Sequence, residues 1–159
     1  MEIEYSDDTL CVGADGALLV LCWWNAPTRE QMLVIDRISA AREEQLKGKT
    51  AYVQFVLEGT PIFTPEVRAI AERITRDYYG VGIAHCIELP GLKGSATRAF
   101  LGGLLLIRGA RGEKPMKVFG DPQAASKWLA GHLSAAEANW GAARILALRE
   151  ALILAHHEG

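Results

Sequence analysis

The sequence predicts an α/β fold, in which a mixed, mostly parallel sheet begins as an antiparallel meander and carries helices packed on it. Three observations lead to this prediction. Beyond the opening hairpin, apolar strand-like runs alternate with stretches of helical periodicity, which is typical of parallel sheets. Asp15-Gly16 separates two apolar runs and indicates a hairpin, because Asp-Gly tolerates positive φ. The segment after Thr64 repeats apolar residues at clean helical intervals.

The meander is expected from three short segments near the N-terminus. They read "IEY" at residues 3–5, "TLCVG" at 9–13 and "ALLVLCWW" at 17–24. The last of these is apolar nearly throughout, which favours a central strand covered on both faces.

The first helix is expected within residues 26–49. Thr28 and Gln31 have the spacing of a capping box, in which each side chain satisfies a backbone N–H near the helix start. Met32, Ile35 and Ile38 recur at helical intervals, and Gly48 ends the segment. A further strand, "TAYVQFVLEG", follows at residues 50–59.

A second helix is expected to begin at Thr64-Pro65-Glu66. Its apolar stripe comprises Val67, Ile70, Ala71, Ile74 and Tyr78. The strand "VGIAHCIEL" comes next, at residues 81–89.

The remaining elements are a loop, two helices, a short strand and a long final helix. The loop "PGLKGS" at 90–95 precedes a short apolar helix, "ATRAFLGGLLLI", with Ser95 as its expected N-cap. "MKVFG" is a last strand, and Asp121-Pro122 begins the helix that buries Trp128. The final helix is expected from about Ala135 to His156.

We therefore predict a domain over residues 1–133 and a C-terminal helical extension over 134–159 that packs on it. Large aliphatic residues point in several directions around the axis of the last helix: Leu146, Leu148, Leu152, Ile153 and Leu154. A helix that is apolar on several faces needs more than one covering surface. We expect one face to pack on the domain and another to bind a second copy or another protein. The alternative is that loops of the same chain cover the second face.

Composition limits the classes of function. The chain has 159 residues and a formal net charge of −2, so nothing in it favours binding to nucleic acid or to an anionic membrane. The acidic start "MEIEYSDD" lacks the features of a signal peptide, and we expect a cytoplasmic protein. Cys11, Cys22 and Cys86 lie in apolar runs without metal-ligand spacing, which predicts reduced core thiols; no metal or cofactor is expected.

The order of elements over about Met1 to Leu133 resembles the STAS family of anti-sigma-factor-antagonist-like domains. The segment "AYVQFVLEGTPIFTPEVRAI" is similar to the strand, loop and helix that carry that family's regulatory phosphoacceptor. "MKVFGDPQAASKWLAGHL" resembles its closing strand and helix, including an Ala-x-x-x-Trp-Leu ending. The chain is also similar to small myxobacterial proteins of this shape. The resemblance implies a non-enzymatic, regulatory protein-binding module from a bacterium.

The phosphoacceptor turn differs from the family pattern. STAS regulators carry Asp-Ser-x-Gly there, whereas residues 62–66 read Ile-Phe-Thr-Pro-Glu. Thr64 falls at the phosphoacceptor position. Its hydroxyl suits a helix N-cap, and the resemblance adds the alternative that it is phosphorylated or contacts a partner.

A second candidate site is a rim where strands end and helices begin. Polar residues that could hold an anion or a small ligand gather there: Glu58, Thr60, Lys93, Ser95 and Thr97. No phosphate-binding signature is present. The alternative interpretation is that the loop at residues 90–95 is a glycine turn that leads into a helix, with no ligand. Glu58 could be a general base. His85 and Cys86 are strand neighbours that face opposite ways, so they cannot act as a pair, and no catalytic set of residues can be assembled.

The protein-binding module is the leading hypothesis. The alternatives are a small-ligand binder or enzyme at this rim, and a structural homo-oligomer.

Overall fold

A computed structural model describes residues 1–59, 63–109, 114–136 and 139–158 of the chain. Within these ranges the side chains of residue 100, residues 103–109 and residue 136 are outside the description. The described strands form one sheet. They are β1 (Glu2–Ser6), β2 (Leu10–Asp15), β3 (Leu18–Trp23), β4 (Ala51–Val56), β5 (Gly82–Ile87) and β6 (Met116–Phe119).

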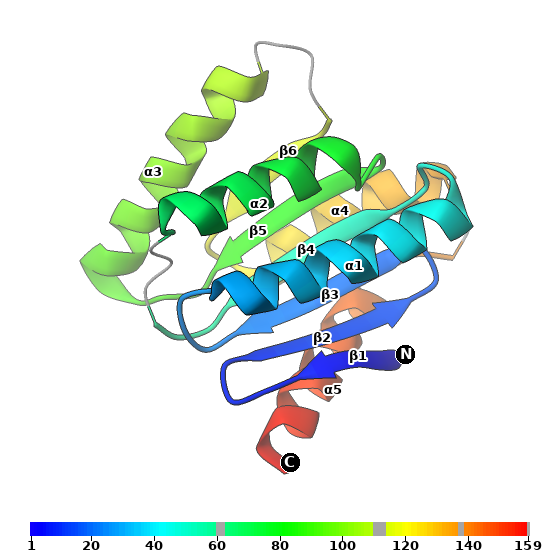
Figure 1. The fold of residues 1–159 in the computed structure, drawn as a ribbon, viewed down its shortest axis with the longest axis horizontal. Helices are drawn as coiled ribbons and strands as arrows, with labels where there is room; N and C mark the ends of the chain where they lie inside the picture. Colours follow the sequence, from blue (N-terminus) through cyan, green and yellow to red (C-terminus); the bar gives the residue numbers. More distant parts are fainter. Residues whose placement is uncertain (60–62, 110–113, 137–138, 159) are drawn as a thin grey trace.

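The strands lie in the sheet in the same order as in the sequence (Figure 1). β1, β2 and β3 pair antiparallel, and β3 to β6 pair parallel. The mixed sheet, its opening meander and the parallel neighbours β3, β4 and β5 confirm the predicted α/β fold. Gly16 takes a φ of 53° in the β2–β3 hairpin, as the Asp-Gly signal requires.

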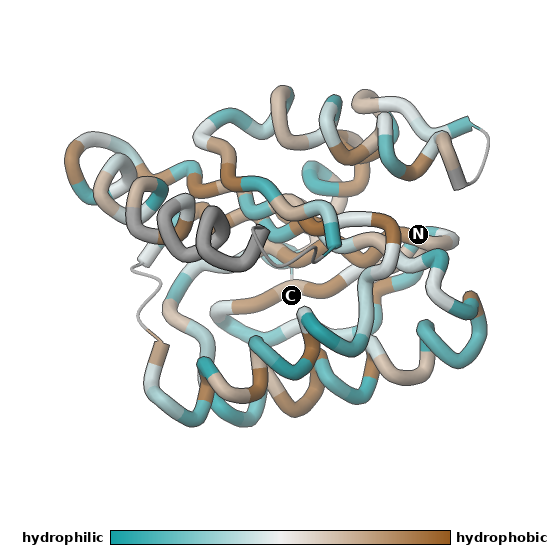
Figure 2. Tube along the Cα trace, turned by 90° about the horizontal axis from the view of Figure 1, so that it is seen from above, coloured by the Kyte–Doolittle hydropathy of each residue, from teal (hydrophilic) through white to brown (hydrophobic). Residues whose placement is uncertain are grey.

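Helices cover both faces of the sheet (Figures 1 and 2). α1 and α2 lie on one face, and α3 lies beside them over β5 and β6. α4 and α5 cover the other face, where α5 packs on β2 and β3 and against α4. Their bounds are α1 (Arg29–Leu46), α2 (Pro65–Asp77), α3 (Gly91–Gly109), α4 (Pro122–Ala136) and α5 (Ala142–Glu158).

Two helix starts follow the sequence signals closely. Thr28 and Gln31 form the full capping box at the start of α1. At the start of α2, the Thr64 hydroxyl accepts a hydrogen bond from the Val67 N–H at 3.3 Å, and Pro65 occupies the first turn.

Two other helix boundaries were predicted wrongly. α3 begins at Gly91 rather than after Ser95, so Ser95 lies inside the helix and is not its N-cap. Gly94 permits this early start, because a Cβ there would stand only 1.8 Å from the Leu89 carbonyl oxygen. The last helix begins at Ala142 rather than near Ala135, and the preceding helix, α4, continues through Ala136. The expected boundary at residue 133 therefore falls inside α4.

The core has two halves, one on each face of the sheet. The α1/α2 face buries Ile35 and Ile74, as predicted, while Ile70 is only partly buried. The α4/α5 face contains the three cysteines as buried free thiols, and Trp128 is partly buried at its border. α5 belongs to this second half, since Ile145, Leu148 and Leu152 are buried in it.

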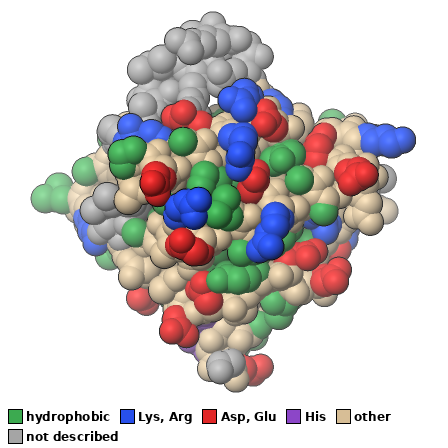
Figure 3. Space-filling model, in the orientation of Figure 1, with side chains coloured by type: hydrophobic (Ala, Val, Ile, Leu, Met, Phe, Trp, Pro, Cys, Tyr) green, Lys and Arg blue, Asp and Glu red, His purple; other side chains and the backbone are tan. Residues whose placement is uncertain are grey.

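The outer surface of α1 and α2 is polar and of mixed charge. Figure 3 shows Lys and Arg side chains interspersed with Asp and Glu across this face. Several are paired, for example Arg73 with Asp36. Among the described helices, none has the length and apolar character needed to cross a membrane.

Candidate functional site

The predicted rim does not form a converging polar site in the described part of the chain. Glu58, Thr64 and Lys93 are all exposed, and no hydrogen bond or ion pair joins these three described residues. Thr60 lies outside the described residues. Thr64 serves as the cap of α2.

The other two rim residues are engaged within α3. The Thr97 hydroxyl donates to the Lys93 carbonyl at 2.9 Å. The Arg98 guanidinium donates to the Ser95 hydroxyl at 3.1 Å and to the Ile87 carbonyl at 2.9 Å. Arg98 therefore ties α3 to the end of β5, and these hydroxyls serve the local structure.

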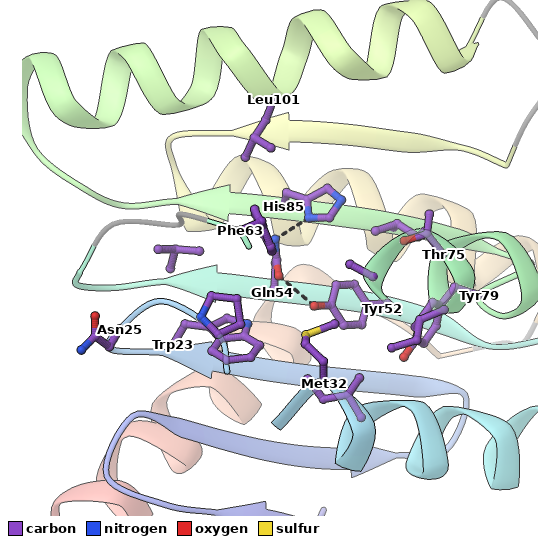
Figure 4. A pocket seen from close by; sticks show the side chains of 16 residues that line it. Trp23, Asn25, Met32, Tyr52, Gln54, Phe63, Thr75, Tyr79, His85 and Leu101 are labelled. Carbon is purple, nitrogen blue, oxygen red and sulfur yellow. Dashed lines mark hydrogen bonds between the residues drawn. The ribbon is translucent and has the colours of Figure 1, made fainter. Parts of the chain in front are cut away.

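A cavity of about 80 Å³ lies between the sheet and the helices of the α1/α2 face. It is not fully enclosed, because its lining includes the exposed Asn25 and the partly buried Phe63 (Figure 4). One water needs only about 10–15 Å³ on this scale, so the space exceeds a single solvent molecule. The lining residues are Trp23, Asn25, Pro27, Met32, Ile35, Tyr52, Gln54, Val56, Phe63, Ala71, Ile74, Thr75, Tyr79, Ile83, His85 and Leu101.

A chain of hydrogen bonds crosses the wall of this cavity. The Tyr52 hydroxyl donates to Gln54 Oε1 at 2.8 Å, and Gln54 Nε2 lies 2.5 Å from His85 Nδ1 (Figure 4). Strand geometry explains the arrangement. Tyr52 and Gln54 are two residues apart on β4 and share a face, and Gln54 is the register partner of His85 on β5.

The hydrogen bonds between Tyr52, Gln54 and His85 also determine which of their atoms donate and which accept. Gln54 Nε2 can only donate, so His85 Nδ1 accepts and the ring proton is on Nε2. Burial raises the pKa of Tyr52 well above its ordinary value, which keeps its hydroxyl protonated as a donor.

Trp23 is a wall residue whose buried polar atom makes no hydrogen bond within the described chain. Its side chain is 4% exposed, and Nε1 has no hydrogen-bond partner among the described residues. The indole N–H lies near the Tyr52 hydroxyl and tends to lower the pKa of that phenol, which burial raises, but no hydrogen bond of normal geometry joins the two groups. An unpaired buried donor is costly and uncommon in folded proteins.

Tyr79 completes the wall in an unusual backbone conformation. Its φ is 58°, in the left-handed region that glycine usually occupies after a helix. Three contacts hold it there. The Tyr79 N–H donates to the Thr50 hydroxyl at 3.0 Å, its own hydroxyl is hydrogen-bonded to Ser39, and its ring centre lies 4.8 Å from that of Tyr52. Non-glycine residues held in this region cluster at functional sites.

On the opposite face, an ion pair joins α5 to the end of β5. Arg149 donates to both carboxylate oxygens of Glu88, at 3.0 and 2.7 Å, and its guanidinium carbon lies 5.4 Å from the centre of the Phe55 ring. Burial works to lower the pKa of Arg149, but the hydrogen bonds and charge of Glu88 outweigh it and raise that pKa. The pair is structural and lies away from the cavity.

A second contact anchors the end of α5. The His156 ring stacks on Trp24 with centroids 3.6 Å apart and planes 13° apart. The sequence predicted only that the last helix ends near His156, and it gave no signal for this contact.

The predicted interface residues on α5 divide into two groups. Leu148 and Leu152 face their own domain and are 8% and 0% exposed. Leu146 and Ile153 are partly buried, and Leu154 is 61% exposed. Only the second group is placed to contact a partner.

Neither the cavity nor the Tyr52–Gln54–His85 chain was predicted from the sequence. A signal was present, because Gln54 and His85 are polar residues inside strands that are otherwise apolar. Their pairing depends on the register of β4 and β5. In contrast, the opposite orientations of His85 and Cys86 were anticipated, since Cys86 lies in the core of the α4/α5 face.

Comparison with protein-family models, with curated proteins and with solved structures finds no match for this chain. The resemblance to STAS domains therefore stays a prediction, and the site is interpreted from its own chemistry.

Proposed function

We propose that this protein binds a small molecule in the cavity between β3–β5 and α1/α2. The observation that carries the proposal is the Tyr52–Gln54–His85 hydrogen-bonded chain in the wall of a mainly apolar cavity that reaches the surface. Such pockets, apolar with a few oriented polar groups, are the usual form of small-molecule sites.

Binding is favoured over catalysis because the polar groups of the wall satisfy one another. His85 Nδ1 is occupied by the Gln54 amide, and Gln54 Oε1 is occupied by the Tyr52 hydroxyl. A base whose lone pair is already used cannot take a proton from a substrate without first breaking that bond. A rigid polar wall instead suits recognition.

The test fills the cavity and leaves the surface of the same helix as a control. Ala71 lines the cavity on α2, and Ala69 is exposed on the same helix. We expect Ala71→Leu to occupy the space, and Ala69→Leu to behave as the wild type. Each protein, labelled with ¹⁵N, is titrated with five single-ring probes: acetophenone, α-methylstyrene, benzamide, benzoate and benzamidinium.

The expected result is that at least one probe shifts the Trp23 indole and Gln54 amide resonances of the wild type and of Ala69→Leu. The same probe should bind Ala71→Leu at least tenfold more weakly. If no probe shifts these resonances at millimolar concentration, or if Ala71→Leu binds as the wild type does while remaining folded, the proposed function is wrong.

The regulatory protein-binding module implied by the STAS resemblance is a second candidate function. The observation that favours it is the position of Thr64, which is exposed at the N-terminus of α2, where a phosphate would meet unpaired backbone N–H groups. Glu66, in the first turn, would oppose that charge. The tests of Thr64 and Leu154 in the Discussion address this candidate.

A further inference from the structure

We infer that the ligand of this cavity is an uncharged aromatic molecule that carries a hydrogen-bond acceptor, such as an aryl ketone or aryl amide, and that Trp23 Nε1 is the donor. This inference rests on the proposed function and adds the class of ligand and its orientation. Three features of the wall support it: its lack of formal charge, its aromatic composition and a buried donor, Trp23 Nε1, without a hydrogen bond in the described chain.

The first feature is electrostatic. None of the described lining residues is Asp, Glu, Lys or Arg. An ion moved from water into this wall would lose hydration and meet no counter-charge, which is strongly unfavourable. The wall therefore selects against carboxylates and ammonium groups.

The second feature is the supply of ring faces. Trp23, Tyr52, Phe63, Tyr79 and His85 all contribute rings to the lining, from β3, β4, β5 and the segments that flank α2. Aromatic rings pack well against one another in offset or edge-to-face arrangements. The volume of about 80 Å³ is roughly half that of an engineered cavity that holds benzene. A single ring therefore fits only if part of it extends beyond this volume.

The third feature is the Trp23 N–H. Tyr52, Gln54 and His85 are engaged with one another, whereas Trp23 Nε1 is buried without a hydrogen bond in the described chain. A ligand oxygen or ring nitrogen placed beside it would satisfy this donor. An apolar ligand would offer it no acceptor.

The experiment uses the five probes as matched pairs. Benzamide, benzoate and benzamidinium have nearly the same shape and differ in charge. Acetophenone and α-methylstyrene differ only by an oxygen in place of a methylene group. We expect benzoate and benzamidinium to bind at least tenfold more weakly than benzamide.

The need for an acceptor is tested by measuring the ratio of the Kd values of α-methylstyrene and acetophenone in each variant. The two probes differ in hydration, but that difference is the same for every variant and cancels when the ratios are compared. The ratio of the α-methylstyrene Kd to the acetophenone Kd should fall about three- to tenfold in Trp23→Phe, the range of a single hydrogen bond. Trp24→Phe is the control, because Trp24 stacks on His156 on the other side of the sheet. That variant should keep the wild-type ratio.

The outcomes separate the inference from the function on which it rests. Equal binding of benzoate or benzamidinium and benzamide would overturn the neutral class. An unchanged ratio in folded Trp23→Phe would overturn the role of Trp23 as donor. In both cases binding itself would still support a small-molecule site, whereas failure of all five probes would remove the site.

Discussion

The two faces of the sheet are built from different chemistry although the same strands supply both. On the α1/α2 face, Tyr52, Gln54 and His85 line a cavity and are joined by hydrogen bonds. On the α4/α5 face, Cys11, Cys22, Cys86 and Phe55 pack with aliphatic side chains from the two helices. Burial raises the pKa of Cys86 to about 12, so its thiol stays protonated and unreactive at neutral pH.

Under the proposed function, this difference separates a stabilising half from a half that binds a ligand. A face filled with apolar groups contributes most by excluding water, and a volume change there is costly. A face that retains a cavity has fewer van der Waals contacts, but its internal hydrogen bonds hold polar groups in defined positions. With a single sheet, one face can stabilise the fold while the other carries the candidate site.

The largest expected effect comes from matched isoleucine deletions on the two faces. Ile145 on α5 is fully buried in the α4/α5 face, and Ile35 on α1 is equally buried but lines the cavity. We expect Ile145→Ala to cost about 4 kcal/mol of unfolding free energy and Ile35→Ala about 2 kcal/mol, because Ile35 already lacks neighbours on one side. Urea denaturation measures both. Equal costs, or the reverse order, would contradict the proposed division between the faces.

The ion pair that joins α5 to β5 should give the next largest effect. Arg149→Met leaves the Glu88 carboxylate, which is 16% exposed, without its partner. We expect a loss of about 1.5–3 kcal/mol, typical of hydrogen bonds to charged groups. The double variant Arg149→Met/Glu88→Gln should be more stable than Arg149→Met alone. If it is less stable, the cost of Arg149→Met comes from lost packing on Phe55.

On the cavity face, Gln54→Leu tests whether the hydrogen-bonded chain stabilises the fold. The change leaves the Tyr52 hydroxyl and His85 Nδ1 without the partner they share. We expect a loss of about 1–2 kcal/mol in urea denaturation, within the range for unsatisfied buried groups. The companion variant Tyr52→Phe/Gln54→Leu should recover part of it. A Gln54→Leu protein as stable as the wild type would show that the chain of hydrogen bonds contributes nothing net to stability.

A smaller effect is expected at the cap of α2. Thr64→Ala should reduce the free energy of unfolding by about 1 kcal/mol, since the Val67 N–H loses its acceptor. Thr64→Asp keeps a capping oxygen and serves as the stability control. If Thr64 is regulatory, Thr64→Glu should change association with a partner more than it changes stability. Identical self-association of the wild type, Ala and Glu proteins in light scattering would leave Thr64 a helix cap.

The smallest effect on stability is expected at the outer side of α5. Leu154→Glu alters an exposed side chain and should change the unfolding free energy by less than about 0.5 kcal/mol. If α5 is the interface, this substitution should lower the molar mass measured by light scattering at high concentration. Leu92→Glu, at the 90% exposed Leu92 of α3, is the control. An unchanged mass for Leu154→Glu would count against an interface at α5.

Much of the fold could be predicted from local patterns. The Asp15-Gly16 hairpin, the capping box at Thr28 and the cap at Thr64 are short-range features that depend on a few neighbouring residues. The parallel pairing of β3, β4 and β5 follows from the alternation of strands and helices. The start of α3 was harder to predict. It depends on the close approach of Gly94 to the Leu89 carbonyl, which helix propensity does not describe.

The candidate site could not be predicted, because it depends on contacts between distant parts of the chain. Gln54 meets His85 only through the register of β4 and β5. Trp23 becomes a buried donor without a hydrogen bond to the described residues only when the folded chain encloses its indole and leaves the nearby Tyr52 hydroxyl outside normal hydrogen-bond geometry. The rim residues were predicted only from their positions near strand ends and helix starts. Ser95 shows why this is insufficient: α3 begins earlier than expected, at Gly91, and the Ser95 hydroxyl accepts a hydrogen bond from Arg98 instead of capping the helix.

The location of α5 has a consequence for synthesis of the chain. α5 packs on β2 and β3, and Arg144 of this helix bonds Asp15 across 129 positions of sequence. On a ribosome, which adds about 5–20 residues per second, the side of β2 and β3 that holds Cys11 and Cys22 would stay uncovered for several seconds after those strands emerge. Chains interrupted before Ala142 would keep that surface permanently open, and they should be bound by chaperones or degraded rather than accumulate.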